Sequence, residues 1–139
     1  MVARGEFAEH FKVHLYQYGT PRQPLEAVIK SGGAMILDVD VQGAQRIKEE
    51  YPQAITIFIL PPSVEELQRR LKRRGTETDE DLLVRYENAK KEMSLWRRFE
   101  YTVINQSLKT AVRQVEAIIE AHPCRTENMD KEQFAKLTR

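Results

Sequence analysis

The sequence predicts an α/β domain in which helices flank a parallel sheet. Two short apolar segments, residues 34–38 and 54–60, are typical of buried strands, because they consist largely of aliphatic side chains and carry almost no charge. The helix-compatible residues 43–50 lie between them. This order is that of a β-strand–α-helix–β-strand unit, whose two strands run parallel.

Length and composition narrow the class of protein further. The 139 residues and their hydrophobic fraction of 41% are enough for one domain with a buried core. A net charge of +1 gives no sign of a surface for nucleic acid or for a membrane. The single Cys124 excludes an internal disulfide framework, and the longest apolar run, residues 55–60, is far too short to span a bilayer. We therefore expect a soluble, cytoplasmic protein.

The first third of the chain is predicted to hold short strands or loops and then a helix. Residues 1–19 are rich in aromatic side chains and show no helical period. Pro21 and Pro24 stand where the first turn of a helix tolerates proline. The segment that follows, residues 25–30, runs into Ser31-Gly32-Gly33, which is typical of a helix end.

Two helices are predicted after the second strand. Ser63 and Glu66 have the spacing of a capping box, which opens a helix that runs to Arg74. The polar residues 76–81 then open a long helix, whose apolar side is formed by Leu82, Tyr86, Ala89, Met93 and Trp96. Two helices that meet at a polar corner predict a movable lid over about residues 75–97.

The chain closes with a third strand and a last helix. Residues 101–104 are β-branched and end at Asn105, and Ser107 is placed to cap the helix that follows. One face of that helix is apolar and carries Leu108, Ala111, Val115, Ile118 and Ile119. Residues 123–139 are polar and are predicted to form a loosely held tail.

Two carboxylates mark the end of the first predicted strand. Asp38 and Asp40 come one residue apart, directly before the helix that starts near Gly43. In open α/β sheets ligands bind at the carboxyl ends of the strands, so these acids are candidates for a site. The alternative is an ordinary strand-to-helix turn, in which Asp40 or Gln42 caps the helix and the other acid is solvated.

A basic cluster surrounds the polar corner. It comprises Arg69, Arg70, Lys72, Arg73 and Arg74 on one predicted helix and Arg85 on the next. Arg70 and Arg74 are four residues apart and share a helix face, and the corner could bring Arg85 opposite them. Three converging guanidinium groups suit a polyphosphate, because each grips phosphate oxygens with two bonds and keeps its charge. The alternative is a solvated helix whose cations pair with Glu65, Glu66 and Glu77.

A polar trio near the N-terminus has the chemistry of guanine recognition. The carboxylate of Glu9 can accept from the ring N–H and the exocyclic amine, and a hydroxyl of Tyr18 or Thr20 can donate to the carbonyl oxygen. Adenine presents a lone pair where the carboxylate needs a proton. The trio alone does not identify the base.

Together these residues resemble those of the guanylate kinases. The matching segments follow the family's order and spacing from about Glu6 to the closing helix. They are Glu6-Phe7-Ala8-Glu9, Tyr18-Gly19-Thr20-Pro21, Ile36-Leu37-Asp38-Val39-Asp40-Val41-Gln42-Gly43, Phe58-Ile59-Leu60-Pro61-Pro62-Ser63, Arg74-Gly75-Thr76-Glu77-Thr78 and Val103-Ile104-Asn105. The resemblance implies a P-loop-kinase-like parallel sheet with flanking helices. It also implies a reaction in which the γ-phosphoryl group of ATP, accompanied by Mg²⁺, passes to GMP.

The resemblance further implies roles for single residues on the GMP side. Glu9 and Thr20 would read the guanine, and Tyr18 would contact the GMP phosphate. Asp38 and Asp40 would face the nucleotide, with Asp38 near the magnesium ion.

On the ATP side the resemblance implies four more site residues. Arg70, Arg74 and Arg85 would act on the transferring phosphoryl group as arginines of the lid. Asn105 would lie against the adenine.

The chain also departs from the family's pattern. None of its six glycines starts a Gly-x-x-x-x-Gly-Lys-Ser/Thr loop, whose backbone N–H groups cradle the ATP phosphates, and the next stretch, whose arginines hold the GMP phosphate, is missing too. Leu15-Tyr16-Gln17 stands where the family usually has a Gly-Asn pair. We therefore expect an incomplete fold without its first strand and phosphate loop. Because phosphoryl transfer depends on positioning and charge neutralisation, this chain alone is predicted to be inactive.

The expected organisation has three parts. Residues 1–32 would be a remnant of the GMP-binding region, residues 33–122 the α/β core with its lid, and residues 123–139 the tail. Without the first strand, the strands at residues 34–38 and 54–60 would each keep an unpaired edge. We therefore expect a homo-oligomer built on sheet edges.

Two rival interpretations keep the fold and change the function. The first is a non-catalytic guanylate-kinase-like scaffold that binds a partner peptide. The presence of Glu9, Tyr18, Thr20 and Asp40 weighs against it. The second is a truncated pseudoenzyme expressed from an internal start at Met1.

Overall fold

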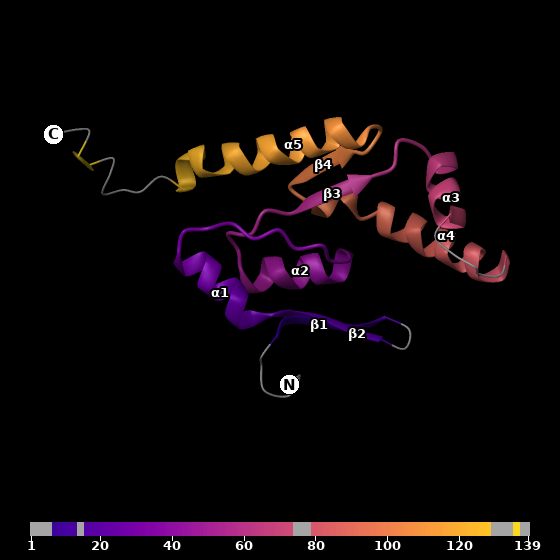
Figure 1. Cartoon of the computed structure of the whole chain (residues 1–139), viewed down its shortest axis with the longest axis horizontal. Coiled ribbons are helices and arrows are strands. Elements are labelled where there is room, and N and C mark those ends of the chain that lie inside the picture. The colour runs from indigo at the N-terminus through magenta and orange to yellow at the C-terminus, as the bar shows by residue number, and fades with distance from the viewer. Residues whose placement is uncertain (1–6, 14–15, 74–78, 129–134, 137–139) are drawn as a thin grey trace. The chain divides into compact units, whose positions relative to one another are not determined.

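The computed structural model describes residues 7–13, 16–73, 79–128 and 135–136, and the chain divides into two compact units (Figure 1). One unit is Met1–Thr56 and the other is Ile57–Arg139. Each holds a two-stranded sheet and helices, and the sheet of the second unit is parallel. The predicted α/β class is therefore confirmed. The three functional parts expected from the sequence stay a prediction.

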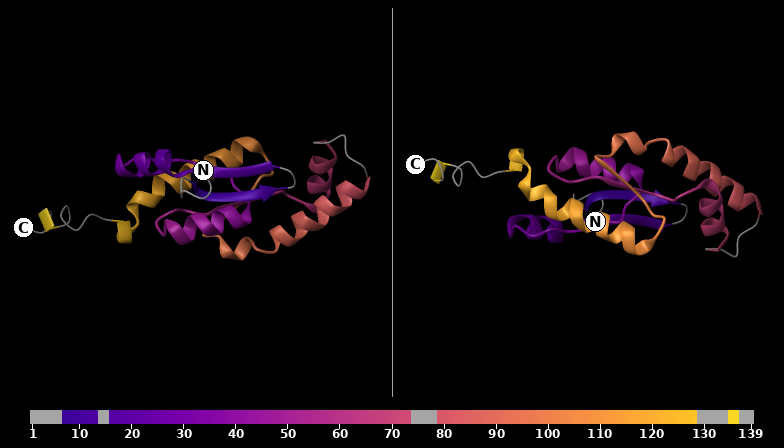
Figure 2. Two further views of the ribbon diagram at one scale, coloured as in Figure 1. Left: turned by 90° about the horizontal axis from the view of Figure 1, so that it is seen from below. Right: turned by 90° about the horizontal axis from the view of Figure 1, so that it is seen from above.

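The first unit begins with an antiparallel hairpin, which confirms the short strands predicted there. Strand β1 is Phe7–Val13 and strand β2 is Tyr16–Pro21. Helix α1, Arg22–Lys30, follows β2 directly along the chain (Figure 2). Both expected prolines stand at its start, Pro21 as the N-cap and Pro24 in the first turn. It ends at Ser31, and Gly32 has φ 72°, a left-handed conformation that glycine adopts without strain.

The strand predicted at residues 34–38 is wrong. These residues belong to no sheet, and the side chain of Ile36 is 76% exposed. An apolar segment becomes a buried strand only where a neighbouring strand takes up its backbone hydrogen bonds, and the part of the chain that the structure describes holds no strand paired with it. The expected β-strand–α-helix–β-strand unit is accordingly not formed. Helix α2, Val41–Glu50, does follow the segment.

A small core and a polar tie hold the first unit together. Ala8, Leu25 and Ile47 are buried, and Leu37, Tyr51 and Ala54 pack against them. Arg22 joins three elements, since its guanidinium donates to the carboxylate of Glu50, to the carbonyl oxygen of Phe7 at 3.2 Å and to the Tyr51 hydroxyl at 3.4 Å.

The second unit is built on a parallel pair of strands. Strand β3 is Ile57–Leu60, three residues shorter than predicted, and strand β4 is Tyr101–Ile104 as predicted. Phe58 is buried and meets the ring of Phe99 edge-on, with 4.8 Å between the ring centroids. Helix α5, Leu108–Ala121, runs beside β4 and buries Ala111 (Figure 1).

Two helices connect these strands. Helix α3, Val64–Arg73, begins where expected, because the backbone N–H of Glu66 donates to Ser63 Oγ at 3.2 Å. Helix α4, Asp79–Met93, packs against α3 and half-buries the expected Leu82, Tyr86, Ala89 and Met93. Trp96 lies beyond α4, in the short 3₁₀ helix η2, Trp96–Arg98. The corner at residues 74–78 lies outside the described residues.

Beyond α5 the described chain forms two single turns. These are the 3₁₀ helices η3, His122–Cys124, and η4, Thr126–Asn128. Among the helices of the described ranges, none is both long and apolar enough to cross a bilayer.

Candidate functional site

The predicted site residues are divided between the two units. The first unit holds the GMP-side candidates Glu9, Tyr18, Thr20, Asp38 and Asp40. The second holds the ATP-side candidates Arg70, Arg85 and Asn105. The ninth predicted site residue, Arg74, lies outside the described residues.

The hairpin brings two of the GMP-side candidates together. In the β1–β2 register Glu9 stands opposite Thr20, and Tyr18 stands opposite Phe11. The backbones of Glu9 and Thr20, which are 11 positions apart in the sequence, are therefore cross-strand neighbours. The register thus brings the two backbone positions together, and the role of these residues in base recognition stays a prediction.

The two carboxylates of the acidic segment have different surroundings. Asp40 caps α2, because its Oδ1 accepts from the backbone N–H of Gly43 at 2.7 Å. The alternative interpretation of an ordinary cap therefore holds for Asp40. Asp38 is exposed, and among the described residues its carboxylate has no hydrogen-bond or ion-pair partner. Neither acid stands at the end of a strand in this structure.

Asp38 has the chemistry of a partner for a hydrated magnesium ion. Mg²⁺ binds oxygen ligands and keeps several waters, so one or two carboxylates together with substrate phosphates are enough to hold it. An exposed, unpaired carboxylate fits that arrangement. Within the described ranges no group of three or more His, Cys, Asp or Glu side chains is placed to hold a metal ion without substrate.

Hydrogen bonds connect Arg70 on α3 to two other residues of the second unit. Its Nε donates to Glu66 Oε1 at 2.7 Å, and its Nη2 donates to the backbone carbonyl oxygen of Asn105 at 3.1 Å. The fold therefore brings together two predicted ATP-side residues that are 35 positions apart. The sequence carries no local signal for this contact, because it joins a helix to the loop after a different strand.

Glu66 is shared between two arginines. Arg69 donates to it through Nε at 2.7 Å and through Nη2 at 2.9 Å, beside the bond from Arg70. These hydrogen bonds, that of Arg69 first, lower the pKa of the Glu66 carboxyl to about 2. The solvated, paired helix offered as the alternative for the basic cluster is thus correct for Arg69, whose side chain is 68% exposed.

Arg85 is the second of the lid arginines that the structure describes. Arg85 lies on α4, which packs against α3, and it is half-buried. The convergence of Arg70, Arg74 and Arg85 on one phosphoryl group stays a prediction, because it depends on the corner between the two helices.

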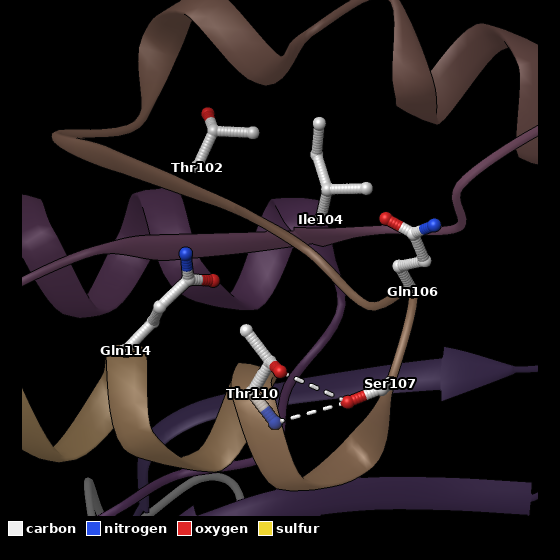
Figure 3. A pocket seen from close by; sticks show the side chains of 6 residues that line it. All are labelled: Thr102, Ile104, Gln106, Ser107, Thr110 and Gln114. Atoms are coloured by element: carbon white, nitrogen blue, oxygen red, sulfur yellow. Dashed lines mark hydrogen bonds between the residues drawn. The ribbon is translucent and has the colours of Figure 1, made fainter.

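A pocket of about 460 Å³ lies at the end of β4 (Figure 3). Its lining is polar apart from one residue and comprises Thr102, Ile104, Gln106, Ser107, Thr110 and Gln114. Ser107 also caps α5 here, since its Oγ accepts from the Thr110 N–H at 3.2 Å. Sequence reasoning did not find this pocket. No charged side chain lines it.

Comparison with known proteins places these features in one family. Residues 1–122 match the family model described as guanylate kinase. The chain is 40% identical over 128 residues to the guanylate kinase of Clostridium perfringens strain SM101, which covers 92% of this chain and 59% of that protein. It is 43% identical over 131 residues to the guanylate kinase of Thermotoga maritima, covering 94% of this chain and 63% of that protein.

The fold agrees with a solved structure. The crystal structure of guanylate kinase from Anaplasma phagocytophilum matches with a TM-score of 0.82 and 28% sequence identity. The match covers 99% of this chain and 67% of that chain. In the curated relatives named above, the chain accordingly spans about three fifths of their length.

Proposed function

This chain belongs to the guanylate kinase family, and we propose that it supplies part of an enzyme that transfers the γ-phosphoryl group of ATP to GMP. The observation that carries the proposal is the contact between Arg70 and Asn105 in a chain with this family match. It joins the residue assigned to the transferring phosphoryl group to the residue assigned to the adenine. One ATP molecule would contact both residues, Asn105 at its adenine and Arg70 at its transferring phosphoryl group, so both must belong to the same side of one site.

We propose that the hairpin selects the acceptor. The Glu9 carboxylate would accept from the two guanine N–H groups, Thr20 would donate to the guanine carbonyl oxygen, and Tyr18 would contact the GMP phosphate. The register that sets Glu9 opposite Thr20 supports this arrangement. Adenine would place an acceptor against the carboxylate, so AMP would leave a buried polar group without its partner.

Catalysis of phosphoryl transfer depends on positioning of the substrates and on neutralisation of charge, and it needs no covalent intermediate with the protein. The developing charge lies on the phosphoryl oxygens, and guanidinium groups that meet those oxygens stabilise it. Arg70, Arg74 and Arg85 are the groups proposed for this role. When magnesium is bound with ATP it neutralises phosphate charge, and Asp38 and Asp40 are the residues proposed to face it, Asp38 more directly.

We propose that the 139 residues alone do not catalyse phosphoryl transfer from ATP to GMP. They contain no Gly-x-x-x-x-Gly-Lys-Ser/Thr sequence to cradle the ATP phosphates. The stretch whose arginines would hold the GMP phosphate is missing as well, so this chain is expected to recognise GMP mainly through its guanine, and guanine recognition and catalysis are expected to separate. A cytoplasmic location also stays a prediction.

We further propose that the chain self-associates through sheet edges. Strand β3 pairs with β4 alone among the described strands, and Ile59 on β3 is 48% exposed. Residues 34–38 are unpaired and expose Ile36. A second copy that adds these residues beside β3 would satisfy both sets of backbone groups.

The function is tested by the choice of base. Calorimetric titration of the protein should show tighter binding of GMP than of AMP, and Glu9→Gln should cut this preference by about 5- to 150-fold, or about 1–3 kcal/mol, because a donor then faces the guanine donors. Glu49→Gln, the same change on the exposed side of α2, is the matched control and should leave the preference intact.

The other outcomes are equally specific. An unchanged preference in Glu9→Gln would remove Glu9 from base recognition. If the unmodified protein bound neither nucleotide, the non-catalytic scaffold would become the better interpretation.

A further inference from the structure

We propose that Glu66 is a positioning residue, which holds the guanidinium of Arg70 in the orientation in which it meets the transferring phosphoryl group. The inference rests on the proposed function, because it gives Arg70 its role. Glu66 itself would touch neither nucleotide. Its effect would pass through Arg70.

The first argument is the geometry of the Arg70 guanidinium. A guanidinium is planar and carries five N–H donors in a fixed fork, so two well-separated anchors determine its plane. Glu66 anchors Nε at 2.7 Å and the Asn105 carbonyl oxygen anchors Nη2 at 3.1 Å. Nη1 makes no hydrogen bond within the described residues, and the Arg70 side chain is 39% exposed. The anchored group therefore presents its remaining donors outward, where an anion can reach them.

The second argument is that both anchors are themselves fixed. The backbone N–H of Glu66 donates to Ser63 Oγ at 3.2 Å, which holds it in the first turn of α3. The backbone N–H of Asn105 donates to the carbonyl oxygen of Leu60 at 2.7 Å, which ties the loop after β4 to the end of β3. The helix turn that carries Glu66 and the loop that carries Asn105 are thus each fixed by a backbone hydrogen bond, which limits the positions that Arg70 can take between them. Groups held in this way lose little freedom when the ligand arrives.

The third argument concerns charge. Arg69 and Arg70 are adjacent, and without an acid between them their like charges would favour separation of the two side chains. Glu66 stays ionised over the whole range in which the enzyme would work, because its pKa is lowered to about 2. Its side chain is only 19% exposed, whereas that of Arg69 is 68% exposed. The carboxylate therefore bridges the two arginines, and its Oε1 is the atom that accepts from Arg70 Nε at 2.7 Å.

A purely structural tie would make the same contacts, so the experiment must separate the two roles. We would compare Glu66→Gln, Arg70→Ala and the double variant in an active protein that contains this sequence. Glu66→Gln keeps the shape of the side chain but sets an amide donor against guanidinium donors. We expect a fall in kcat of about tenfold, with KM for GMP nearly unchanged, because the interaction is realised in the transition state.

The double variant reports whether the effect passes through Arg70. If it does, Glu66→Gln should cost almost nothing in the Arg70→Ala background, so the two effects should be strongly non-additive. Glu65→Gln is the matched control. It removes the same charge from the same turn of α3, and Glu65 makes no contact with Arg70, so kcat should stay within about twofold of the unmodified protein.

A second readout is independent of activity. In ¹⁵N NMR spectra of the 139-residue chain, the Nε–H of Arg70 should exchange slowly with water. Glu66→Gln should speed this exchange, and Glu65→Gln should leave it unchanged. Thermal unfolding of each variant identifies a general loss of fold.

The outcomes that overturn the proposal are distinct from those that overturn the function. Additive effects in the double variant, or an Arg70 Nε–H that exchanges at the same rate in Glu66→Gln, would reduce Glu66 to a surface ion pair while GMP phosphorylation remained. If the unmodified protein that contains this sequence did not phosphorylate GMP, the proposed function would be overturned. The positioning role of Glu66 would then be overturned as well.

Discussion

At the scale of single residues, Asp40 has two uses for one carboxylate. It accepts from the Gly43 N–H and so caps α2, and it is also proposed to face the nucleotide. Asn caps a helix about as well as Asp, while Ala costs about 1 kcal/mol at such a position. Asp40→Asn therefore removes the charge and keeps the cap, and Asp40→Ala removes both.

We expect Asp40→Asn to keep the stability of the protein and Asp40→Ala to lower it by about 1 kcal/mol in a denaturant titration. In an active protein both variants should lower kcat, because both remove the charge that faces the nucleotide. Full activity in a stable Asp40→Asn protein would show that the carboxylate is a helix cap alone.

Single-residue features differ in how far they follow from sequence. The caps at Ser63 and Ser107 are predictable, because the polar side chain and the N–H that it accepts from lie three residues apart. The contact of Arg70 with Asn105 is not predictable, because the two residues are 35 positions apart and no local sequence pattern links them. The pairing of Glu9 with Thr20 falls between these cases: strands are predicted there, but their register comes from the structure.

At the scale of elements, α5 depends on its first turn. Ser107 Oγ accepts from the Thr110 N–H at 3.2 Å, and the hydroxyl also donates to Thr110 Oγ1 at 3.0 Å. Ser107→Ala should therefore lower the free energy of unfolding by about 1 kcal/mol, measured with urea.

The matched control for the Ser107→Ala substitution is Ser94→Ala, directly after the end of α4. Its hydroxyl donates to the carbonyl oxygen of Lys91 at 2.6 Å and caps no N-terminus. We expect this variant to stay within about 0.5 kcal/mol of the unmodified protein. Equal losses from the two substitutions would show that the cap adds nothing beyond an ordinary serine contact.

Helices and strands also differ in how far sequence predicts them. Each helix from α1 to α5 corresponds to a predicted helix, because its caps, prolines and apolar side are local signals, although α1 starts before the predicted segment 25–30 and α4 ends before the expected Trp96. Residues 34–38 have the composition of a buried strand and yet form none, because a strand also needs a partner along its edge. The same reason shortens the predicted strand at residues 54–60 to β3, whose length matches that of β4.

At the scale of the whole molecule, the unpaired edges predict self-association. We expect sedimentation and light scattering to show a species larger than one chain at micromolar concentration. Ile36→Lys should shift it toward the single chain, because a charge on an edge opposes strand addition. Leu83→Lys is the control, since Leu83 is also exposed but lies on α4, away from any sheet edge.

Dilution distinguishes the alternatives. A stable, well-folded single chain throughout the micromolar range would show that the edges need no partner. Equal dissociation in Ile36→Lys and Leu83→Lys would place the interface elsewhere.

The two strand pairs also differ in the length of chain that each encloses. Glu9 pairs with Thr20, 11 positions later, whereas Ile57 pairs with Tyr101, 44 positions later. Closing a loop four times as long costs about 1.2 kcal/mol more in chain entropy. The parallel pair should therefore form more readily after α3 and α4 have folded, because the folded helices shorten the chain between β3 and β4. We therefore expect the amides of β1 and β2 to gain protection before those of β3 and β4 when refolding is followed by pulsed hydrogen exchange. Simultaneous protection would mean that both units fold in one step. Protection in the expected order would mean that the sequence separation of the paired strands determines which unit folds first.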